Sequence, residues 1–264
     1  MPTVSNLSDG ALIAANNAAK AQRDFSKSIA KLSTGKRTMY GSDPAGQSVA
    51  DSLKANSKSW YIAARNAEDG ISAAQLVESA LMEISSLSQR LRELGTQANN
   101  SDILSDADMS ALDAEAAAIY DTIDGIITST KFNGKDLLGF SVKMHQVAVA
   151  DNGSSIYFKS NDGFTSVSDN NTATGAVAIA DTILSEAATN LGNSAAAMSA
   201  FKARQAVAYS ASANLAAAAA RIEDTDYAQE SANLAKSSIM NQSAMAMVAQ
   251  ANQANAAFLT IINQ

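Results

Sequence analysis

The C-terminal part of the sequence, from Ser237 to Gln264, contains no charged residue but has a regular apolar pattern. Its apolar residues recur at alternating spacings of four and three: Met240, Ala244, Met247, Ala251, Ala254, Phe258 and Ile261, with Met245, Val248, Leu259 and Ile262 in an adjacent row. This spacing puts side chains on one face of an α-helix and is typical of a coiled-coil seam. The many Asn, Gln and Ser residues between them argue against a membrane span. A helix that packs on another helix is therefore predicted.

The N-terminal segment carries a matching stripe: Leu7, Ala11, Ala14, Ala18, Ala21, Phe25, Ile29 and Leu32. An isolated two-helix coiled coil would show charged residues at the flanking positions, and these are missing from the C-terminal segment. One pair of such helices would leave much apolar surface in water, which indicates partners. Identical copies that meet head to tail form open filaments when their rotation does not close. We expect two terminal arms whose outer faces are covered by other copies of the chain.

The region between the arms shows further helices and a short β-rich part. Apolar stripes run from Ala74 to Ala98 and from Met109 to Ile126, and Ser105 with Asp108 is typical of a helix N-cap. Short apolar runs on both sides of 151–153 predict a β-hairpin, and the Ser/Thr/Asn-rich tract after it predicts an exposed loop. The expected fold class is mainly α, with long antiparallel helices forming a coiled-coil rod and a small β-hairpin region at the chain midpoint.

The predicted domains follow from this order of elements. Residues 1–43 with 225–264 are expected to form the terminal coiled-coil arms. Residues 44–139 with 176–224 are expected to form a helical rod, and 140–175 the hairpin and exposed loop. The N-terminal residues lack a basic region and a long apolar core, so we do not expect a secretory signal there.

Composition argues against several function classes. A net charge of -7 and a pI of about 4.7 make a nucleic-acid partner unexpected. The chain has no cysteine, which excludes disulfides, thiolate metal sites and a cysteine nucleophile. His145 is the only histidine and is expected to be a plain polar position on a strand. Phosphate-binding loops and nucleophile elbows are also missing, so no catalytic, cofactor or metal site is predicted and the chain is not expected to be an enzyme.

Several stretches carry a family pattern: Leu32-Ser33-Thr34-Gly35, Arg65-Asn66-Ala67-Glu68-Asp69-Gly70-Ile71-Ser72, Gln89-Arg90-Leu91-Arg92-Glu93-Leu94, Phe132-Asn133-Gly134, Arg221-Ile222-Glu223-Asp224-Thr225-Asp226-Tyr227-Ala228 and Gln250-Ala251-Asn252-Gln253. With these the chain resembles bacterial flagellin, in a short form without large outer domains. The resemblance implies an extracellular structural subunit of the bacterial flagellar filament, used for swimming. It also implies an inner tube made of the arms and unfolded export through the flagellar type III apparatus, with an export chaperone and a filament cap as partners.

The resemblance also points to particular residues. The expected inner-core assembly residues are Leu7, Ala11, Phe25, Ile29, Leu32, Met240, Met247, Val248, Phe258, Leu259, Ile261 and Ile262. In flagellins the segment that corresponds to Gln89, Arg90, Glu93, Leu94 and Gln97 packs between subunits and is bound by the flagellin-sensing Toll-like receptor; a merely solvated face is the alternative here. Possible O-glycosylation acceptors are Thr165, Ser166, Ser168, Thr172 and Thr174, with a plain polar loop as the alternative.

The sequence also suggests one set of ion pairs and two alternative functions. The basic row Lys20, Arg23, Lys27 and Lys31 is hypothesised to pair with Glu223, Asp224, Asp226 and Glu230, within or between subunits. The chain could instead be a hook–filament junction protein of the flagellin-like group, which shares the terminal arms. It could also be a surface adhesin that binds glycans or host receptors through residues 140–175.

Overall fold

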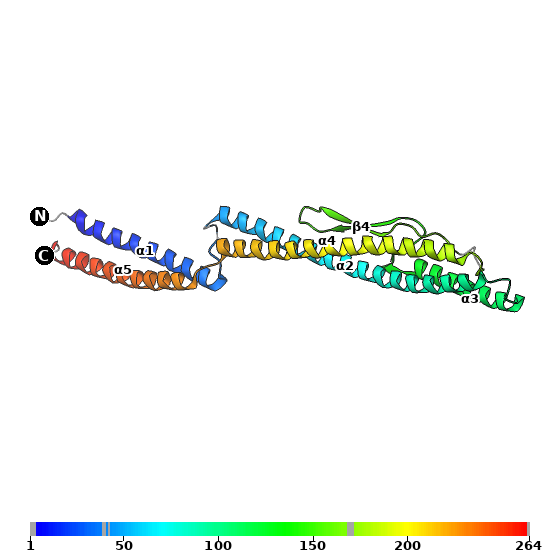
Figure 1. Ribbon diagram of the computed structural model, residues 1–264. Helices are drawn as coiled ribbons and strands as arrows, with labels where there is room; N and C mark the ends of the chain where they lie inside the picture. Colours follow the sequence, from blue (N-terminus) through cyan, green and yellow to red (C-terminus); the bar gives the residue numbers. More distant parts are fainter. Residues whose placement is uncertain (1–3, 39–40, 42, 168–171, 263–264) are drawn as a thin grey trace. The chain divides into compact units, whose positions relative to one another are not determined.

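The computed structural model describes residues 4–38, 41, 43–167 and 172–262 (Figure 1). Its helices are α1 (Val4–Thr34), α2 (Pro44–Ala98), α3 (Asp106–Ser129), α4 (Ala176–Glu223) and α5 (Tyr227–Ile262). Its strands are β1 (Lys131–Phe132), β2 (Lys135–Asp136), β3 (Lys143–Ala148) and β4 (Ser155–Asn161). The expected fold class, long antiparallel helices with a small β-hairpin region in the middle of the chain, is confirmed.

The chain divides into two compact units. The arm unit consists of Met1–Lys54 and Ala216–Gln264, and the central unit consists of Ala55–Leu215. The arm unit thus takes in the first turns of α2 and the last turns of α4 in addition to α1 and α5. Among the helices that the structure describes, none has the length and apolar character needed to cross a membrane.

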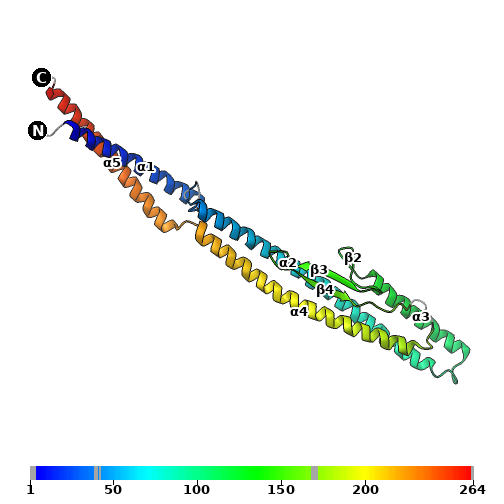
Figure 2. The same ribbon diagram turned by 90° about the horizontal axis from the view of Figure 1, so that it is seen from above.

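In the arm unit, α1 and α5 lie side by side and run antiparallel (Figures 1 and 2). Helix α1 ends at Gly35, whose φ of 70° lies in the left-handed region and whose N–H donates to the Lys31 carbonyl at 2.8 Å. Glycine ends helices in this way because it adopts positive φ without steric cost. A side chain here would also meet the Tyr227 hydroxyl, which lies 2.9 Å from the position of an added Cβ.

The central unit is built on α2, α3 and α4, with α2 antiparallel to the other two (Figure 2). The predicted stripe on α2 is buried at Ala74, Val77, Leu81, Ile84, Leu91, Leu94 and Ala98. Helix α3 begins with the predicted cap: Ser105 accepts from the Asp108 N–H, and the Asp108 carboxylate accepts from the Ser105 N–H at 3.1 Å. This reciprocal pair satisfies donors that a helix start leaves open, so α3 begins where the sequence indicates.

Two small antiparallel hairpins complete the central unit. Strands β1 and β2 are joined by Asn133 and Gly134, with φ values of 48° and 75° that match the right-handed twist of the strands. Strands β3 and β4 form the predicted second hairpin. Its inner face places Phe158 in the core with 1% exposure, while the adjacent Tyr157 on the outer face is 63% exposed.

The described part of the tract after β4 is exposed at its polar residues, as its composition predicts, but it also contains buried apolar residues that were not predicted. Phe164, Val167 and Ala173 are buried in the same core as the helices. The Ala173 N–H also donates to the Asp113 carboxylate of α3 at 2.7 Å. The prediction was wrong on this point because single apolar residues in a polar run make no periodic signal, although each can still anchor the backbone.

Candidate functional site

The surface where α1 and α5 meet is a narrow seam of mostly small side chains. On α1 the residues turned towards α5 are half-buried or buried: Ala14, Ala18, Ala21, Phe25, Ser28 and Leu32. On α5 they are Glu230, Leu234, Ser237, Asn241, Ala244, Val248 and Ala251. Both sets follow spacings of four and three without a break, as in a coiled coil. Small residues allow the two backbones to approach closely.

Polar bonds cross this seam at two levels. The Ser28 hydroxyl, which is 4% exposed, donates to the Glu230 carboxylate at 2.7 Å, and Lys31 lies 3.6 Å from the same carboxylate. Further along, the Asn241 amide donates to the Gln22 side chain. Burial opposes ionisation of Glu230, but the Ser28 hydrogen bond and the Lys31 charge keep its pKa below the ordinary value. Polar pairs across a helix seam, such as the buried Ser28–Glu230 pair, favour one register of the helices over others.

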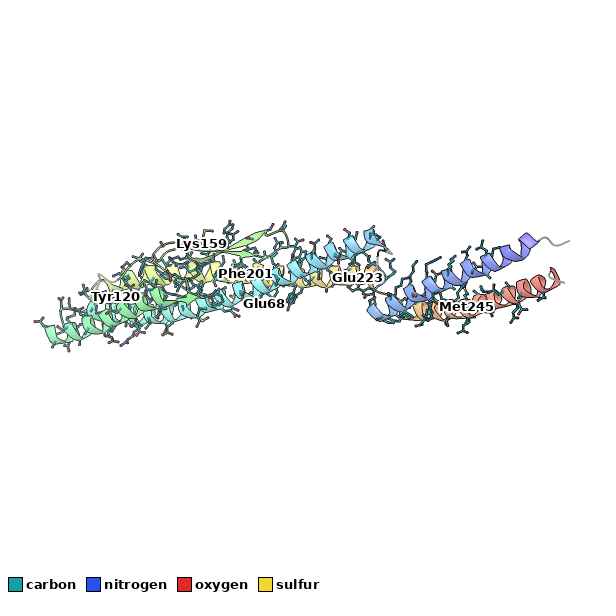
Figure 3. The ribbon with its side chains drawn as sticks, turned by 180° about the vertical axis from the view of Figure 1, so that it is seen from behind. Glu68, Tyr120, Lys159, Phe201, Glu223 and Met245 are labelled. Atoms are coloured by element: carbon teal, nitrogen blue, oxygen red, sulfur yellow. The ribbon has the colours of Figure 1, made fainter. Side chains whose placement is uncertain are left out.

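Several large apolar side chains of the arms lie on the outside of this pair. On α1, Leu12 is 60% and Ile13 is 61% exposed. On α5, Ile239 and Met247 are each 64% exposed, and Met245, labelled in Figure 3, is 59% exposed. An isolated soluble helix pair would bury such residues and expose polar ones. The arm unit therefore offers apolar surface to a partner.

The predicted inner-core residues fall into three groups: some lie in the seam, some lie beside it, and the side chains of the others are not described by the structure. Phe25, Leu32 and Val248 are half-buried in the seam. Ile29, at 45% exposure, Met240, at 47%, and Met247 lie outside it, and Ser28, Asn241 and Val248 occupy the seam at these three levels. The smaller neighbours take the seam because they permit the close approach of the helices. At its other described positions the predicted stripe matches the seam, as at Ala18, Ala21, Ala244 and Ala251. The remaining side chains lie outside the described residues: Leu7, Ala11, Phe258, Leu259, Ile261 and Ile262.

A buried carboxylate pairs with basic residues just after α1 and on α2, in a region that we call the junction. Glu223, at the end of α4, has no exposed side-chain surface and forms ion pairs with Lys36 and Lys54. Hydrogen bonds from Lys36 and then from Lys54 lower the pKa of Glu223, while Glu223 raises the pKa of Lys36. Arg37 donates from its guanidinium to the Ile222 carbonyl at 2.8 Å, which places a cation at the C-terminus of α4. Of the hypothesised ion pairs between the basic row and the acidic residues, the structure contains Lys31–Glu230, whereas Glu223 pairs with Lys36 and Lys54 instead.

We expect acid to loosen this junction. Because the folded-state pKa of Glu223 is lowered, its contribution to stability is fully present above the ordinary glutamate pKa and is lost as the pH falls through the folded value. Urea unfolding of the full chain between pH 7 and pH 3, followed by circular dichroism, measures this loss. In Glu223→Gln the pH slope should be smaller than in the wild type. The control Glu83→Gln removes an exposed carboxylate that makes no ion pair among the described residues, and should keep the wild-type slope. An unchanged slope in Glu223→Gln would contradict the assignment.

The second candidate surface is the outward face of α2 near its C-terminus. Gln89, Arg90, Glu93 and Gln97 are exposed there, as their spacing predicts. Arg90 donates to Glu115 of α3 at 2.7 Å and to Glu93 at 3.0 Å, and these carboxylates raise its pKa, with Glu115 having the larger effect. Leu94 is fully buried in the core, so its inclusion in a contact surface was wrong: it faces away from any partner.

The hydroxyls considered for glycosylation lie in the tract after β4. Thr165, Ser166, Thr172 and Thr174 are exposed, and Ser168 lies outside the described residues. The Thr165 hydroxyl donates to Glu186 at 2.7 Å, and the Thr172 hydroxyl donates to the Thr174 carbonyl at 3.2 Å. These bonds hold part of the tract in place.

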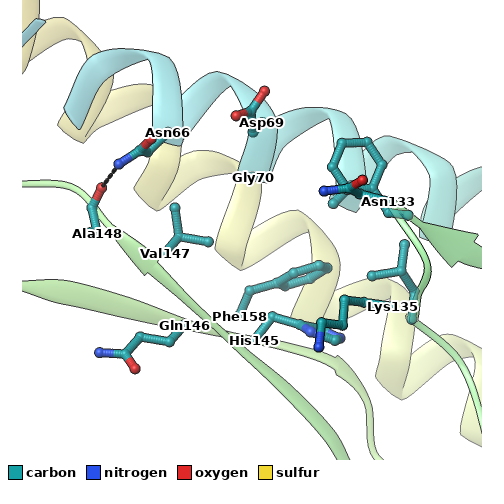
Figure 4. A pocket seen from close by; sticks show the side chains of 13 residues that line it. Asn66, Asp69, Gly70, Asn133, Lys135, His145, Gln146, Val147, Ala148 and Phe158 are labelled. Carbon is teal, nitrogen blue, oxygen red and sulfur yellow. Dashed lines mark hydrogen bonds between the residues drawn. The ribbon is translucent and has the colours of Figure 1, made fainter. Parts of the chain in front are cut away.

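A pocket of about 420 Å³ lies between α2 and the hairpins (Figure 4). Asn66 bridges it by donating to the Ala148 carbonyl at 3.1 Å. His145 is half-buried there against Phe158, and burial, then the charges of Lys143 and Lys135, lower its pKa. Among the described residues no three metal-ligating side chains come together.

The two ends of the chain match two parts of one protein family. Residues 6–142 match the bacterial flagellin N-terminal helical region, and residues 174–262 match the bacterial flagellin C-terminal helical region. The chain belongs to the bacterial flagellin family. A flagellin of Bacillus subtilis (strain 168) is 32% identical over 270 residues, which cover 86% of this chain and 89% of that protein. A flagellin of Xenorhabdus nematophila is 40% identical over 153 residues, which cover 58% of this chain and 49% of that protein.

The chain therefore spans about half the length of the Xenorhabdus flagellin but most of the Bacillus one. It also matches the crystal structure of Bacillus cereus flagellin, with 25% identity and a TM-score of 0.38 over 57% of this chain and 88% of that one. The expected function is confirmed: the chain is a structural subunit of a flagellar filament. The flagellin family is structural rather than enzymatic, and the comparisons do not favour a junction protein or an adhesin.

Proposed function

We propose that the α1–α5 pair forms the inner layer of the filament and that its outward apolar side chains are covered by the arms of neighbouring copies. In this proposal, residues 1–43 with 225–264 form the inner core, and 44–139 with 176–224 form the surrounding helical layer. The observation that carries it is the arrangement of the arms: the seam holds mostly small side chains, while several bulky apolar ones remain exposed outside it.

The exposed apolar side chains of the arms can supply the free energy of assembly. Burying one large apolar side chain contributes about 1.5–3 kcal/mol. Several such side chains of each arm are exposed in the single chain, including Leu12, Ile13, Ile239 and Met247. Their burial between copies would offset the conformational and translational entropy that assembly costs. Without neighbours the same surfaces would favour non-specific aggregation.

The outward face of α2 is proposed as a second contact between copies. Arg90 is already oriented there by Glu93 and Glu115, so a partner that binds it meets a side chain with little remaining freedom. The same face, with Gln89 and Gln97, is the proposed surface for a flagellin-sensing Toll-like receptor. This part rests on the resemblance of the segment to its counterpart in flagellins.

Extracellular location and unfolded export through the flagellar type III apparatus belong to the same proposal, with an export chaperone and a filament cap as partners. Family membership supports them, as does the lack of cysteine, since a chain without disulfides can pass through a narrow channel unfolded.

Removal of residues 251–264 tests the inner-layer proposal. The shortened chain is expected to stay soluble and largely helical, because the core of the central unit does not involve these residues. It should no longer polymerise, because the end of α5 that neighbouring arms would cover is gone. Sedimentation and negative-stain microscopy measure polymerisation, with the full chain as control. Normal filaments from the shortened chain would contradict the proposal.

A further inference from the structure

The outward face of α1 carries a basic row without an internal counterpart. Lys20, Arg23 and Lys27 are all exposed, and among the described residues none of them forms an ion pair. Lys31, the next basic residue, differs because it faces Glu230 across the seam. The seam positions of α1 include Ala18, Ala21 and Ser28, so the row lies on the side of the helix turned away from α5.

The neighbouring helix cannot neutralise this row. Helix α5 has no acidic residue after Glu230, and among the described residues neither Glu230 nor Asp226 forms an ion pair with Lys20, Arg23 or Lys27. Asp24, on α1 itself, comes within ion-pair distance of none of the three basic residues. The row shares its face with Leu12 and Ile13, which are apolar and exposed. A surface that combines basic and large apolar side chains suits a partner with carboxylates beside apolar groups.

The base of the same arm unit exposes such carboxylates. Asp51 and Asp224 are exposed, and neither forms an ion pair among the described residues. The Asp51 carboxylate accepts from the Gln47 amide at 3.0 Å, and Asp224 pairs through its backbone with Lys36. The pKa of Lys36 is raised by Glu223 and, to a smaller extent, by these two carboxylates. Among the described residues, neither carboxylate lies within ion-pair distance of Lys20, Arg23 or Lys27 of its own chain. In a second copy they are available.

We propose that in the filament the basic row Lys20, Arg23 and Lys27 of one copy docks against the junction carboxylates Asp51 and Asp224 of a second copy. This inference rests on the proposed inner-layer function and adds the contact that orients neighbouring arms. Charge complementarity supports it, because identical copies that meet head to tail bring two different surfaces together. Apolar contacts supply most of the affinity in such an interface, and charges select orientation and register.

The critical concentration for assembly tests the docking. In Lys20→Glu with Lys27→Glu it is expected to rise about tenfold at low ionic strength, as two interface pairs become repulsive. Added NaCl should raise the critical concentration of the wild type, because exposed charges are screened beyond roughly 10 Å at 0.1 M salt. The reversed variant should lose or invert this dependence. The matched control Lys58→Glu with Lys202→Glu makes the same change in net charge on the central unit and should behave as the wild type.

A mixing experiment identifies the partner carboxylates. Asp51→Lys with Asp224→Lys should also assemble poorly alone, whereas an equal mixture with the reversed α1 variant should copolymerise, since each supplies the charge that the other lost. Circular dichroism of each monomer establishes that it is folded. A mixture that assembles no better than its parts, or α1 reversals with wild-type critical concentration and salt response, would overturn the docking. Row-dependent binding to phosphatidylglycerol vesicles without any effect on assembly would also overturn it. Failure of the wild type to polymerise would instead count against the proposed inner layer.

Discussion

Replacing Met240 and Met247 with aspartate is expected to abolish filament formation while the monomer keeps its helical content. Both side chains are largely exposed in the single chain and lie beside the seam rather than in it, so the α1–α5 pair does not need them. In the assembled state they would be buried. An unpaired buried carboxylate costs at least several kcal/mol in addition to about 1.5–3 kcal/mol of lost apolar burial per side chain.

Sedimentation and electron microscopy over a range of protein concentrations measure this effect. We expect the critical concentration to rise by at least about 100-fold, which corresponds to roughly 3 kcal/mol per added subunit. The conservative variant Met240→Leu with Met247→Leu keeps the apolar surface and should assemble almost normally. Filaments formed by the aspartate variant at the wild-type concentration would show that this side of α5 faces solvent.

Replacing Phe201 with alanine is expected to destabilise the central unit by about 3–5 kcal/mol, the usual cost of removing a buried aromatic ring. Phe201, labelled in Figure 3, is fully buried on α4. It packs edge-on against Phe158 of β4, with ring centroids 6.2 Å apart. On its other side it lies over Gly70 of α2, where an added Cβ would be 3.0 Å from the ring. One side chain therefore joins both long helices of the central unit to the hairpin.

Urea unfolding followed by circular dichroism measures the loss. The control Val207→Ala removes an apolar side chain of the same helix that is 54% exposed, and should cost less than about 0.5 kcal/mol. A loss below about 1 kcal/mol for Phe201→Ala would mean that the hairpin and the helices do not share one core. Filament assembly by this variant should weaken only as far as the central unit unfolds.

Much of the architecture could be predicted because its signals are local. The stripe from Ala74 to Ala98 on α2 is periodic, and Ser105 with Asp108 caps the start of α3 within one helical turn. The turn at Asn133 and Gly134 likewise depends on two adjacent residues that adopt positive φ. Each of these features is decided by residues close in sequence, so composition and spacing suffice to recognise them.

The arms show why the rest could not be predicted. Helix α5 offers two neighbouring stripes with the same spacing, one through Met240 and Met247 and one through Asn241 and Val248. The stripe through Met240 and Met247 is the more hydrophobic, but the stripe through Asn241 and Val248 lets the backbones of α1 and α5 approach more closely. That distance depends on both helices together, so the sequence of one helix does not reveal it. The ion pairs of Glu223 depend similarly on three segments that are far apart in sequence.

Because most side chains in the seam are small, a few polar contacts determine the axial alignment of α1 and α5. Alanine and serine recur along it every seven residues, so a slide of one helix past the other by two turns would bring near-equivalent surfaces together again. What such a slide would break is the bond between Ser28 and Glu230 and the bond between Gln22 and Asn241. These two contacts therefore fix the axial register of α1 on α5, and with it how far each arm extends past the other.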